Sequence, residues 1–208
     1  MMLTPLLIIL VIFFLAVLFF ALYKIDDLKK TEGNMTSERK SAVTFKGNPI
    51  TLIGPELKAG EKAPNFKVLA GDLSEVTLDK FKGKTLLISV VPSLDTPVCD
   101  MQTKRFNEEA GKLPADVAVV TVSVDLPFAQ KRWCGAAHAD KVQCLSDHRE
   151  ANFGQAYGVL IKELRLLTRA IFVIGPDQKI QYVEYVKEVT QHPDYDKALN
   201  SIKAGSRA

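Results

Sequence analysis

The side chains of this sequence best suited to nucleophilic chemistry are its three thiols, Cys99, Cys134 and Cys144. A cysteine reacts as the thiolate, so the surroundings of each sulfur decide whether it is reactive or inert. An odd number of cysteines at wide spacing does not form a structural disulfide framework, and no Cys-x-x-Cys pair is present for dithiol chemistry. The pattern favours chemistry that begins at a single thiol.

Cys99 stands where a helix is expected to begin. The apolar run Lys84 to Val91 predicts a buried strand, and the stretch from Val98 to Lys112 has a helical pattern. Pro97 suits a first helical turn, and Thr96 or Asp95 can cap it. A sulfur at this place faces free backbone N–H groups and the positive end of the helix dipole, which both favour the thiolate. We therefore expect Cys99 to be reactive, whereas Cys144, in the apolar segment from Val142 to Leu145, is expected to be a buried core thiol.

The elements that must position Cys99 alternate between strands and helices. The further expected strands are Val117 to Val124, Ala170 to Ile174 and Ile180 to Val186, the last two paired antiparallel, and the further expected helices are Leu126 to Ala136 and Asp194 to Ile202. A β-hairpin is expected at the start, with Val43 to Phe45 and Ile50 to Leu52 on either side of a Gly-Asn-Pro turn. The order predicts an α/β sheet flanked by helices.

The residues around Cys99 resemble a known family. Pro92-x-x-x-Thr96-x-x-Cys99, within VPSLDTPVCD, resembles the peroxiredoxin active-site signature, and the longer string is similar to the thiol peroxidase subfamily, the atypical two-cysteine type. Further similar segments are SVDLPFAQKRWCG, QAYGV and LLTRAIFVI, in a resemblance that extends from Val43 to Ala204. It implies a thioredoxin-like fold, a homodimer, no cofactor or metal, and reduction of hydrogen peroxide and organic hydroperoxides with electrons from thioredoxin.

The resemblance also implies roles for five residues. Cys99 corresponds to the peroxidatic cysteine, which becomes a sulfenic acid, and Cys134 to the resolving cysteine, which joins it in an intramolecular disulfide. Arg169 corresponds to the active-site arginine, Thr96 would hold the peroxide in line, and Pro92 would shield the thiolate from water. Without the resemblance, four other arginines are equal candidates: Arg105, Arg132, Arg149 and Arg165.

Physical chemistry adds two expectations. A thiol with the reference pKa near 8.5 is about 3% ionised at pH 7, so full ionisation gains only about 30-fold in rate, and the rest must come from binding the transition state. In the reduced fold we expect the sulfurs of Cys99 and Cys134 to lie too far apart for a bond of roughly 2 Å. Both segments must then open locally before the disulfide forms.

The first residues suggest a membrane anchor. No Lys, Arg, Asp or Glu precedes Lys24, and a helix from Leu6 to Tyr23 would rise roughly 27 Å, near the thickness of the hydrocarbon core. We expect an uncleaved single-pass transmembrane anchor at residues 1–23, a polar tether at 24–41 and the peroxidase domain at 42–208. Basic residues after the span weakly favour a cytoplasmic domain, and a periplasmic or other extracytoplasmic location stays open.

Other classes of function are also open. The pairs Cys134-x3-His138 and Cys144-x3-His148 have spacing that a zinc site tolerates. A membrane-tethered redox sensor or docking module could use the same thiol without turnover. Nucleic acid binding is excluded, because the net charge is only +3 and the basic residues form no block.

Overall fold

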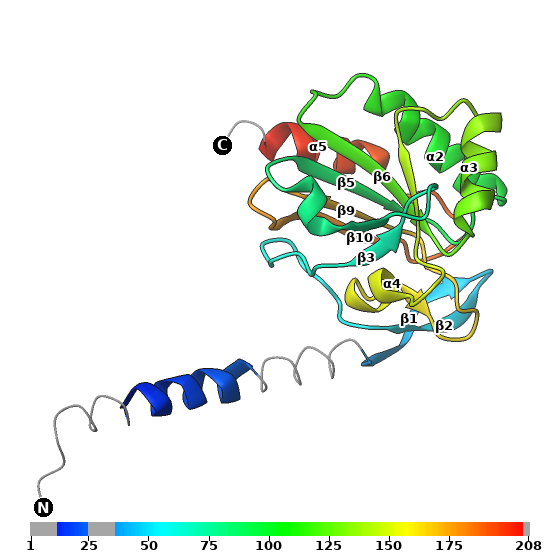
Figure 1. The fold of residues 1–208 in the computed structure, drawn as a ribbon. Helices are drawn as coiled ribbons and strands as arrows, with labels where there is room; N and C mark the ends of the chain where they lie inside the picture. Colours follow the sequence, from blue (N-terminus) through cyan, green and yellow to red (C-terminus); the bar gives the residue numbers. More distant parts are fainter. Residues whose placement is uncertain (1–11, 25–35, 206–208) are drawn as a thin grey trace, which may run out of the picture.

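The protein is described by a computed structural model that covers residues 12–24 and 36–205. Residues 12–24 form a helix whose apolar side chains are exposed (Figure 1). Within these residues no helix has the length and apolarity needed to cross a membrane. The expected transmembrane helix at residues 1–23, and the membrane localisation built on it, are therefore wrong; residues 1–11 of that span lie outside the described residues.

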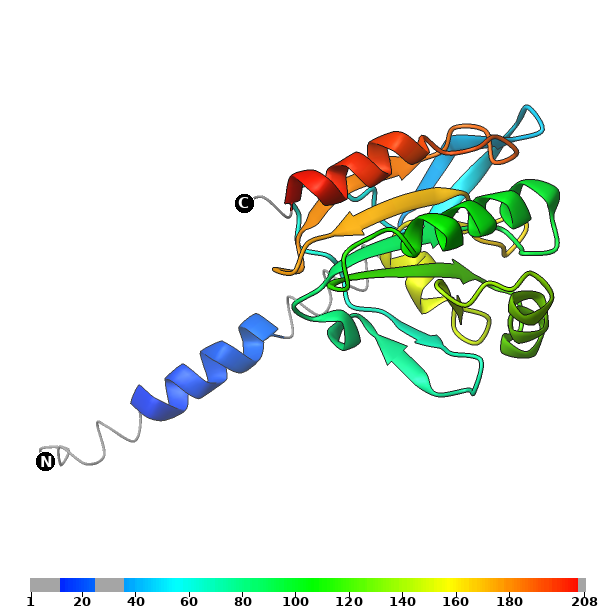
Figure 2. The same ribbon diagram turned by 90° about the horizontal axis from the view of Figure 1, so that it is seen from above.

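A seven-stranded sheet runs through the domain in the order β10-β9-β5-β6-β7-β3-β4 (Figures 1 and 2). The central strands β5, β6 and β7 are parallel, while β9 pairs antiparallel with both β5 and β10. The bounds are β3 Lys67–Leu69, β4 Glu75–Thr77, β5 Thr85–Val90, β6 Val117–Ser123, β7 Gln143–Ser146, β9 Ala170–Ile174 and β10 Ile180–Tyr185. The expected strands and the antiparallel pairing of β9 with β10 are confirmed.

Helices cover both faces of this sheet. They are α2 Pro97–Ala110, α3 Pro127–Ala136, α4 Asn152–Ala156 and α5 Tyr195–Gly205, with a 3₁₀ turn at Leu78–Phe81. Every residue of β5 is buried, and its side chains alternate between two cores. Leu87 packs with Phe106 of α2 and Ala198 of α5, whereas Leu86 and Ile88 belong to the core on the other face. The predicted layered α/β arrangement is confirmed.

A smaller sheet of β1 Glu38–Phe45, β2 Asn48–Ile53 and β8 Leu160–Ile161 lies beside α4 (Figure 1). β1 and β2 form the expected hairpin, but its turn is Lys46-Gly47, since Asn48 and Pro49 already belong to β2. Lys46 and Gly47 both have positive φ, as a two-residue type I′ turn requires. β1 begins at Glu38, so residues 38–41 of the expected tether belong to the sheet, and residues 25–35 of the tether lie outside the described residues.

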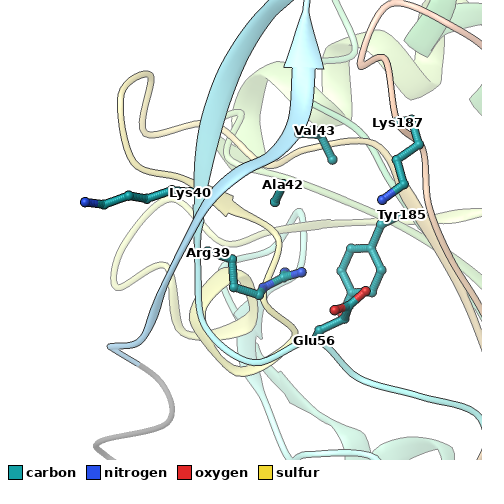
Figure 3. A pocket seen from close by; sticks show the side chains of 7 residues that line it. All are labelled: Arg39, Lys40, Ala42, Val43, Glu56, Tyr185 and Lys187. Atoms are coloured by element: carbon teal, nitrogen blue, oxygen red, sulfur yellow. The ribbon is translucent and has the colours of Figure 1, made fainter.

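The small sheet is held to the domain by close backbone packing. Gly158 has φ +61°, and a Cβ on it would lie 1.8 Å from the carbonyl oxygen of Pro55. Arg39 adds hydrogen bonds to the carbonyls of Gly54, at 3.1 Å, and Gly158. Its guanidinium also lies 4.9 Å from the ring centroid of Tyr185, at a hollow of about 250 Å³ (Figure 3). Because its donors already bind carbonyls, Arg39 has a structural role in this hollow.

Replacing Gly158 should therefore be costly. We expect Gly158→Ala to lower the free energy of unfolding by about 3 to 5 kcal/mol, from strain at positive φ and from overpacking against Pro55. Gly83→Ala is the matched control, because Gly83 has φ +79° and a Cβ added there would meet nothing within 4 Å. That variant should lose only about 1 to 2 kcal/mol. Urea denaturation measures both, and equal losses would contradict the packing argument.

Asp147 offers a test of the packing around α4. This buried carboxylate accepts hydrogen bonds from the N–H groups of Phe153, at 3.0 Å, and Gly154, at 2.7 Å. Burial outweighs these bonds and raises the pKa of Asp147 to about 6. The folded state therefore holds its proton to a higher pH than the unfolded chain, which titrates near about 3.9.

Stability should accordingly fall as the pH rises through this window. From pH 4 to pH 6, Asp147 should remove about 2 kcal/mol from the free energy of unfolding, because the folded state binds more protons there than the unfolded state. The loss should be absent in Asp147→Asn and present in Asp140→Asn, since the Asp140 side chain is 72% exposed. Parallel pH slopes for wild type and Asp147→Asn in urea denaturation would contradict this account.

Candidate active site

Cys99 lies in the first turn of α2, at the edge where the parallel strands end. β5 ends at Val90, a short loop follows, and the helix begins at Pro97 with Thr96 as its N-cap residue. The side chain of Cys99 is 0% exposed, and its thiol is free. The expected helix start is thus confirmed, and the sulfur is held in a dry environment where nearby charges act strongly.

Thr96 contacts this sulfur directly. Its Oγ1 lies 2.8 Å from Sγ of Cys99 and 3.2 Å from the carbonyl oxygen of Ser93. The hydroxyl forms no capping hydrogen bond to the helix backbone, in contrast to the capping role considered for it. It has one proton, so it can donate to a thiolate, or it can accept from the thiol while donating to Ser93. The Thr96 hydroxyl can therefore form a hydrogen bond with Cys99 whether Cys99 is a thiol or a thiolate.

Arg169 reaches the same sulfur from the residue before β9. Its side chain is almost fully buried, and Nη2 lies 3.3 Å from Sγ of Cys99. Nε donates to the carbonyl of Val189 at 2.9 Å, and Nη1 to Oε1 of Gln102 at 2.6 Å. In the described part of the chain no carboxylate lies within ion-pairing distance of this guanidinium. The structure thus distinguishes Arg169 from the other arginines, since a buried cation without a carboxylate favours an anion on its remaining neighbour, the sulfur.

Gln102 was not predicted from the sequence. Its Oε1 accepts from Arg169, and its Nε2 donates to Oγ of Ser89 on β5 at 2.8 Å. The amide therefore fixes the guanidinium relative to both the helix and the sheet. Its place three residues after Cys99 puts both side chains on one helix face, which is the sequence pattern that could have indicated it.

Asp125 was also missed. It follows β6, and its carboxylate accepts hydrogen bonds from Oγ of Ser93 and from the backbone N–H of Leu94, both at 2.8 Å. These bonds hold the loop that leads to Cys99. Adjacent parallel strands end at the same edge of a sheet, so a carboxylate just after β6 could have been expected near the loop after β5.

A cavity of about 340 Å³ opens over these residues. Its lining includes three of the expected site residues, Pro92, Thr96 and Arg169. The rest is largely apolar and includes Phe45, Val98, Leu166 and Val189. Pro92 is buried in this lining, close to the polar groups that contact Cys99. The cavity thus reaches Thr96 and Arg169, which contact the sulfur of Cys99, while Cys99 itself is fully buried behind this lining.

Cys134 lies in α3, and its sulfur is paired with the third thiol of the chain. Its Sγ is 3.1 Å from Sγ of Cys144 on β7, and all three thiols are free. Cys144 is buried, as expected for a core thiol. Next to Cys134, the indole Nε1 of Trp133 donates to Asp100 at 3.2 Å, which ties α3 to the first turn of α2. Nothing in the sequence pattern indicated that Cys134 and Cys144 are neighbours.

The close pair alters the acidity of both thiols. The hydrogen bond from Cys144 lowers the pKa of Cys134. The same bond, followed by burial and by the charge of a Cys134 thiolate, raises the pKa of Cys144. Cys134 is therefore the thiol of this pair that ionises first.

The four residues of the candidate zinc site are not brought together as ligands. Across residues 12–24 and 36–205, no three His, Cys, Asp or Glu side chains are grouped so as to hold a metal ion. Nδ1 of His148 lies 2.9 Å from Oγ of Ser146.

Comparison with known proteins identifies the family. Residues 58–199 match the Redoxin family. The chain is 63% identical to the thiol peroxidase of Halalkalibacterium halodurans over 79% of this chain and 98% of that protein. It is 58% identical to the thiol peroxidase of Bacillus subtilis, over 78% and 96%.

Solved structures agree with the expected thioredoxin-like peroxiredoxin fold. A peroxiredoxin-like protein from Aquifex aeolicus matches with a TM-score of 0.74 and 43% identity, over 80% of this chain and 98% of that one. The thiol peroxidase of Chromobacterium violaceum has the same fold, with a TM-score of 0.71 at 20% identity over 79% and 97%. The chain therefore belongs to the Redoxin family and is an enzyme of its peroxiredoxin-type thiol peroxidases.

Proposed function

We propose that Cys99 reduces hydrogen peroxide and organic hydroperoxides through a sulfenic acid, that Cys134 resolves it in an intramolecular disulfide, and that thioredoxin reduces the disulfide. The observation that carries the proposal is the position of the Cys99 sulfur, 2.8 Å from the Thr96 hydroxyl and 3.3 Å from the Arg169 guanidinium. A homodimer is part of the proposal, by analogy with the family.

The first step transfers one oxygen. The Cys99 thiolate attacks the terminal peroxide oxygen, an S–O bond forms as the O–O bond breaks, and an alkoxide or hydroxide leaves and takes a proton. Negative charge moves from sulfur to the leaving oxygen, so a donor that serves both atoms stabilises the transition state more than the ground state. Arg169 can do this because its planar guanidinium is buried beside the sulfur and fixed by Gln102 and Val189.

The cavity supports organic hydroperoxides as substrates alongside hydrogen peroxide. Its volume of about 340 Å³ exceeds what hydrogen peroxide needs, and the lining includes Phe45, Leu166 and Val189. Apolar surface removed from water by a bound alkyl group contributes roughly 25 cal/mol per Å². The hydroperoxide end would then meet Thr96 and Arg169 while the alkyl group contacts the apolar wall.

Resolution requires both cysteine segments to open. Cys99 is buried, and its sulfur contacts the hydroxyl of Thr96 and the guanidinium of Arg169. The sulfur of Cys134 contacts the sulfur of Cys144. A disulfide needs the two sulfurs at roughly 2 Å. The hydrogen bond between Trp133 and Asp100 joins the two segments, so it must break or shift as they unwind.

Mass mapping tests the two thiol roles. After one equivalent of peroxide we expect a Cys99–Cys134 bridge to form first in the wild type, and an oxidised, unbridged Cys99 in Cys134→Ser. Cys99→Ala should lose at least about 1000-fold in peroxidase activity, because the nucleophile is gone. Cys99→Ala activity equal to that of the wild type would refute the proposal.

Arg169 has its own test. Arg169→Lys retains the charge but removes the fork of donors, and we expect kcat/KM for peroxide to fall about 100- to 1000-fold. Arg105→Lys is the control, because Arg105 is exposed and pairs with Glu109 on the helix surface at 3.1 Å. Similar rates for the two variants in a peroxide-consumption assay would show that the planar donors are not needed.

Turnover separates this enzyme mechanism from a redox sensor that uses the same thiol. With thioredoxin and its reductase supplied, the protein should consume many equivalents of peroxide per chain. A sensor would stop after stoichiometric oxidation. If the protein consumes peroxide continuously only when another thiol is supplied, the peroxidase mechanism stands, but thioredoxin is not its reductant.

A further inference from the structure

Cys144, the sulfur neighbour of Cys134, has no part in the two-cysteine cycle proposed above. In the reduced protein the two sulfurs lie 3.1 Å apart, so a disulfide between them would fit the closed fold after a shift of only about 1 Å. Cys144 is on β7 and Cys134 on α3, which packs against that strand. Cys99 belongs to the same apolar cluster as this pair, together with Val91 and Leu94.

We propose that Cys144 is a second resolving thiol, which takes over the disulfide from Cys99. This inference rests on the proposed function of Cys99 and Cys134. Once these two are bridged, Cys144 loses its proton to solvent and attacks Sγ of Cys134. The Cys99–Cys134 bond breaks, Cys99 leaves as a thiolate, and a Cys134–Cys144 disulfide remains. The exchange moves one disulfide and needs no further oxidant or reductant.

The product of this exchange fits the fold better than its precursor. A Cys99–Cys134 bridge holds both helix segments open, because each sulfur must leave its contacts in the reduced protein. Transfer to Cys144 allows Cys99 to return to Thr96 and Arg169. The departing sulfur carries a negative charge, and the buried guanidinium of Arg169 is placed to receive it.

The pKa of Cys144 should fall once Cys99 and Cys134 are bridged, which is when Cys144 has to act as the nucleophile. In the reduced protein its pKa is raised first by its hydrogen bond to Cys134, and also by the charge of that thiolate. Both causes vanish once Cys134 is bound in a disulfide, although burial and the nearby Asp125 remain. Cys144 thus becomes a better nucleophile when its target has formed.

Peptide mapping of the full-length protein tests the transfer. Trypsin can cut after Lys141, so it separates Cys134 from Cys144 and makes a bridge between them visible. After one equivalent of peroxide without reductant, we expect a Cys99–Cys134 bridge that declines as a Cys134–Cys144 bridge and an alkylatable Cys99 appear. Cys144→Ser keeps a hydrogen-bond donor next to Cys134, and should stop at the first bridge.

Peroxide consumption gives a second readout. In the absence of a reductant, transfer frees Cys99 to react again, so the wild type should consume about two equivalents per chain in the fast phase and Cys144→Ser about one. A lasting Cys99–Cys134 bridge with Cys144 alkylated in the wild type would overturn the transfer. So would a Cys134–Cys144 bridge that forms at the wild-type rate in Cys99→Ala.

Failure of the proposed function looks different. If Cys99 is not the peroxidatic residue, Cys99→Ala retains peroxidase activity, and no Cys99–Cys134 bridge forms in Cys144→Ser. If only the transfer is wrong, Cys99→Ala is inactive, and that bridge forms and persists in both the wild type and Cys144→Ser.

Discussion

A buried guanidinium with no carboxylate partner among the described residues is the constraint on which this active site depends. The charge of Arg169 is removed from water, and its donors meet a carbonyl, an amide oxygen and the sulfur of Cys99. Of these three acceptors, only the sulfur can become an anion. A thiolate at Cys99 and the charge of Arg169 therefore stabilise each other, and the dry surroundings strengthen the interaction.

The sheet explains how residues far apart in the sequence meet at this charge. β5 leads to Cys99, β6 leads to Asp125, and β9 begins beside Arg169. β5 pairs with both β6 and β9, so the ends of the three strands lie at one edge. Gln102 then links α2 to β5 through Ser89 and also binds Arg169. The packing of α2 on the sheet therefore sets the distance between the Cys99 sulfur and the guanidinium.

The sequence predicted the parts of this structure that depend on local pattern. Apolar, β-branched runs indicated the strands of the central sheet, and Pro97 before Cys99 indicated the helix start. Short β3, β4 and β8 have too few residues to show a period. The role of Arg169 came only from the resemblance, because its neighbours are set by strand pairing. The contact of Cys134 with Cys144 was missed because it depends on how α3 packs against β7. The expected membrane span was wrong, since no helix among the described residues is long and apolar enough to cross a membrane.

The hydrogen bond between Trp133 and Asp100 has a practical consequence. Trp133 is the single tryptophan of the chain, and its hydrogen bond to Asp100 joins the two segments that would unwind in the proposed disulfide step. Its indole leaves a half-buried, hydrogen-bonded site whenever α2 and α3 separate. The protein thus carries a native fluorophore where α2 meets α3, and the emission of that one residue would follow the proposed opening and closing in real time without any label.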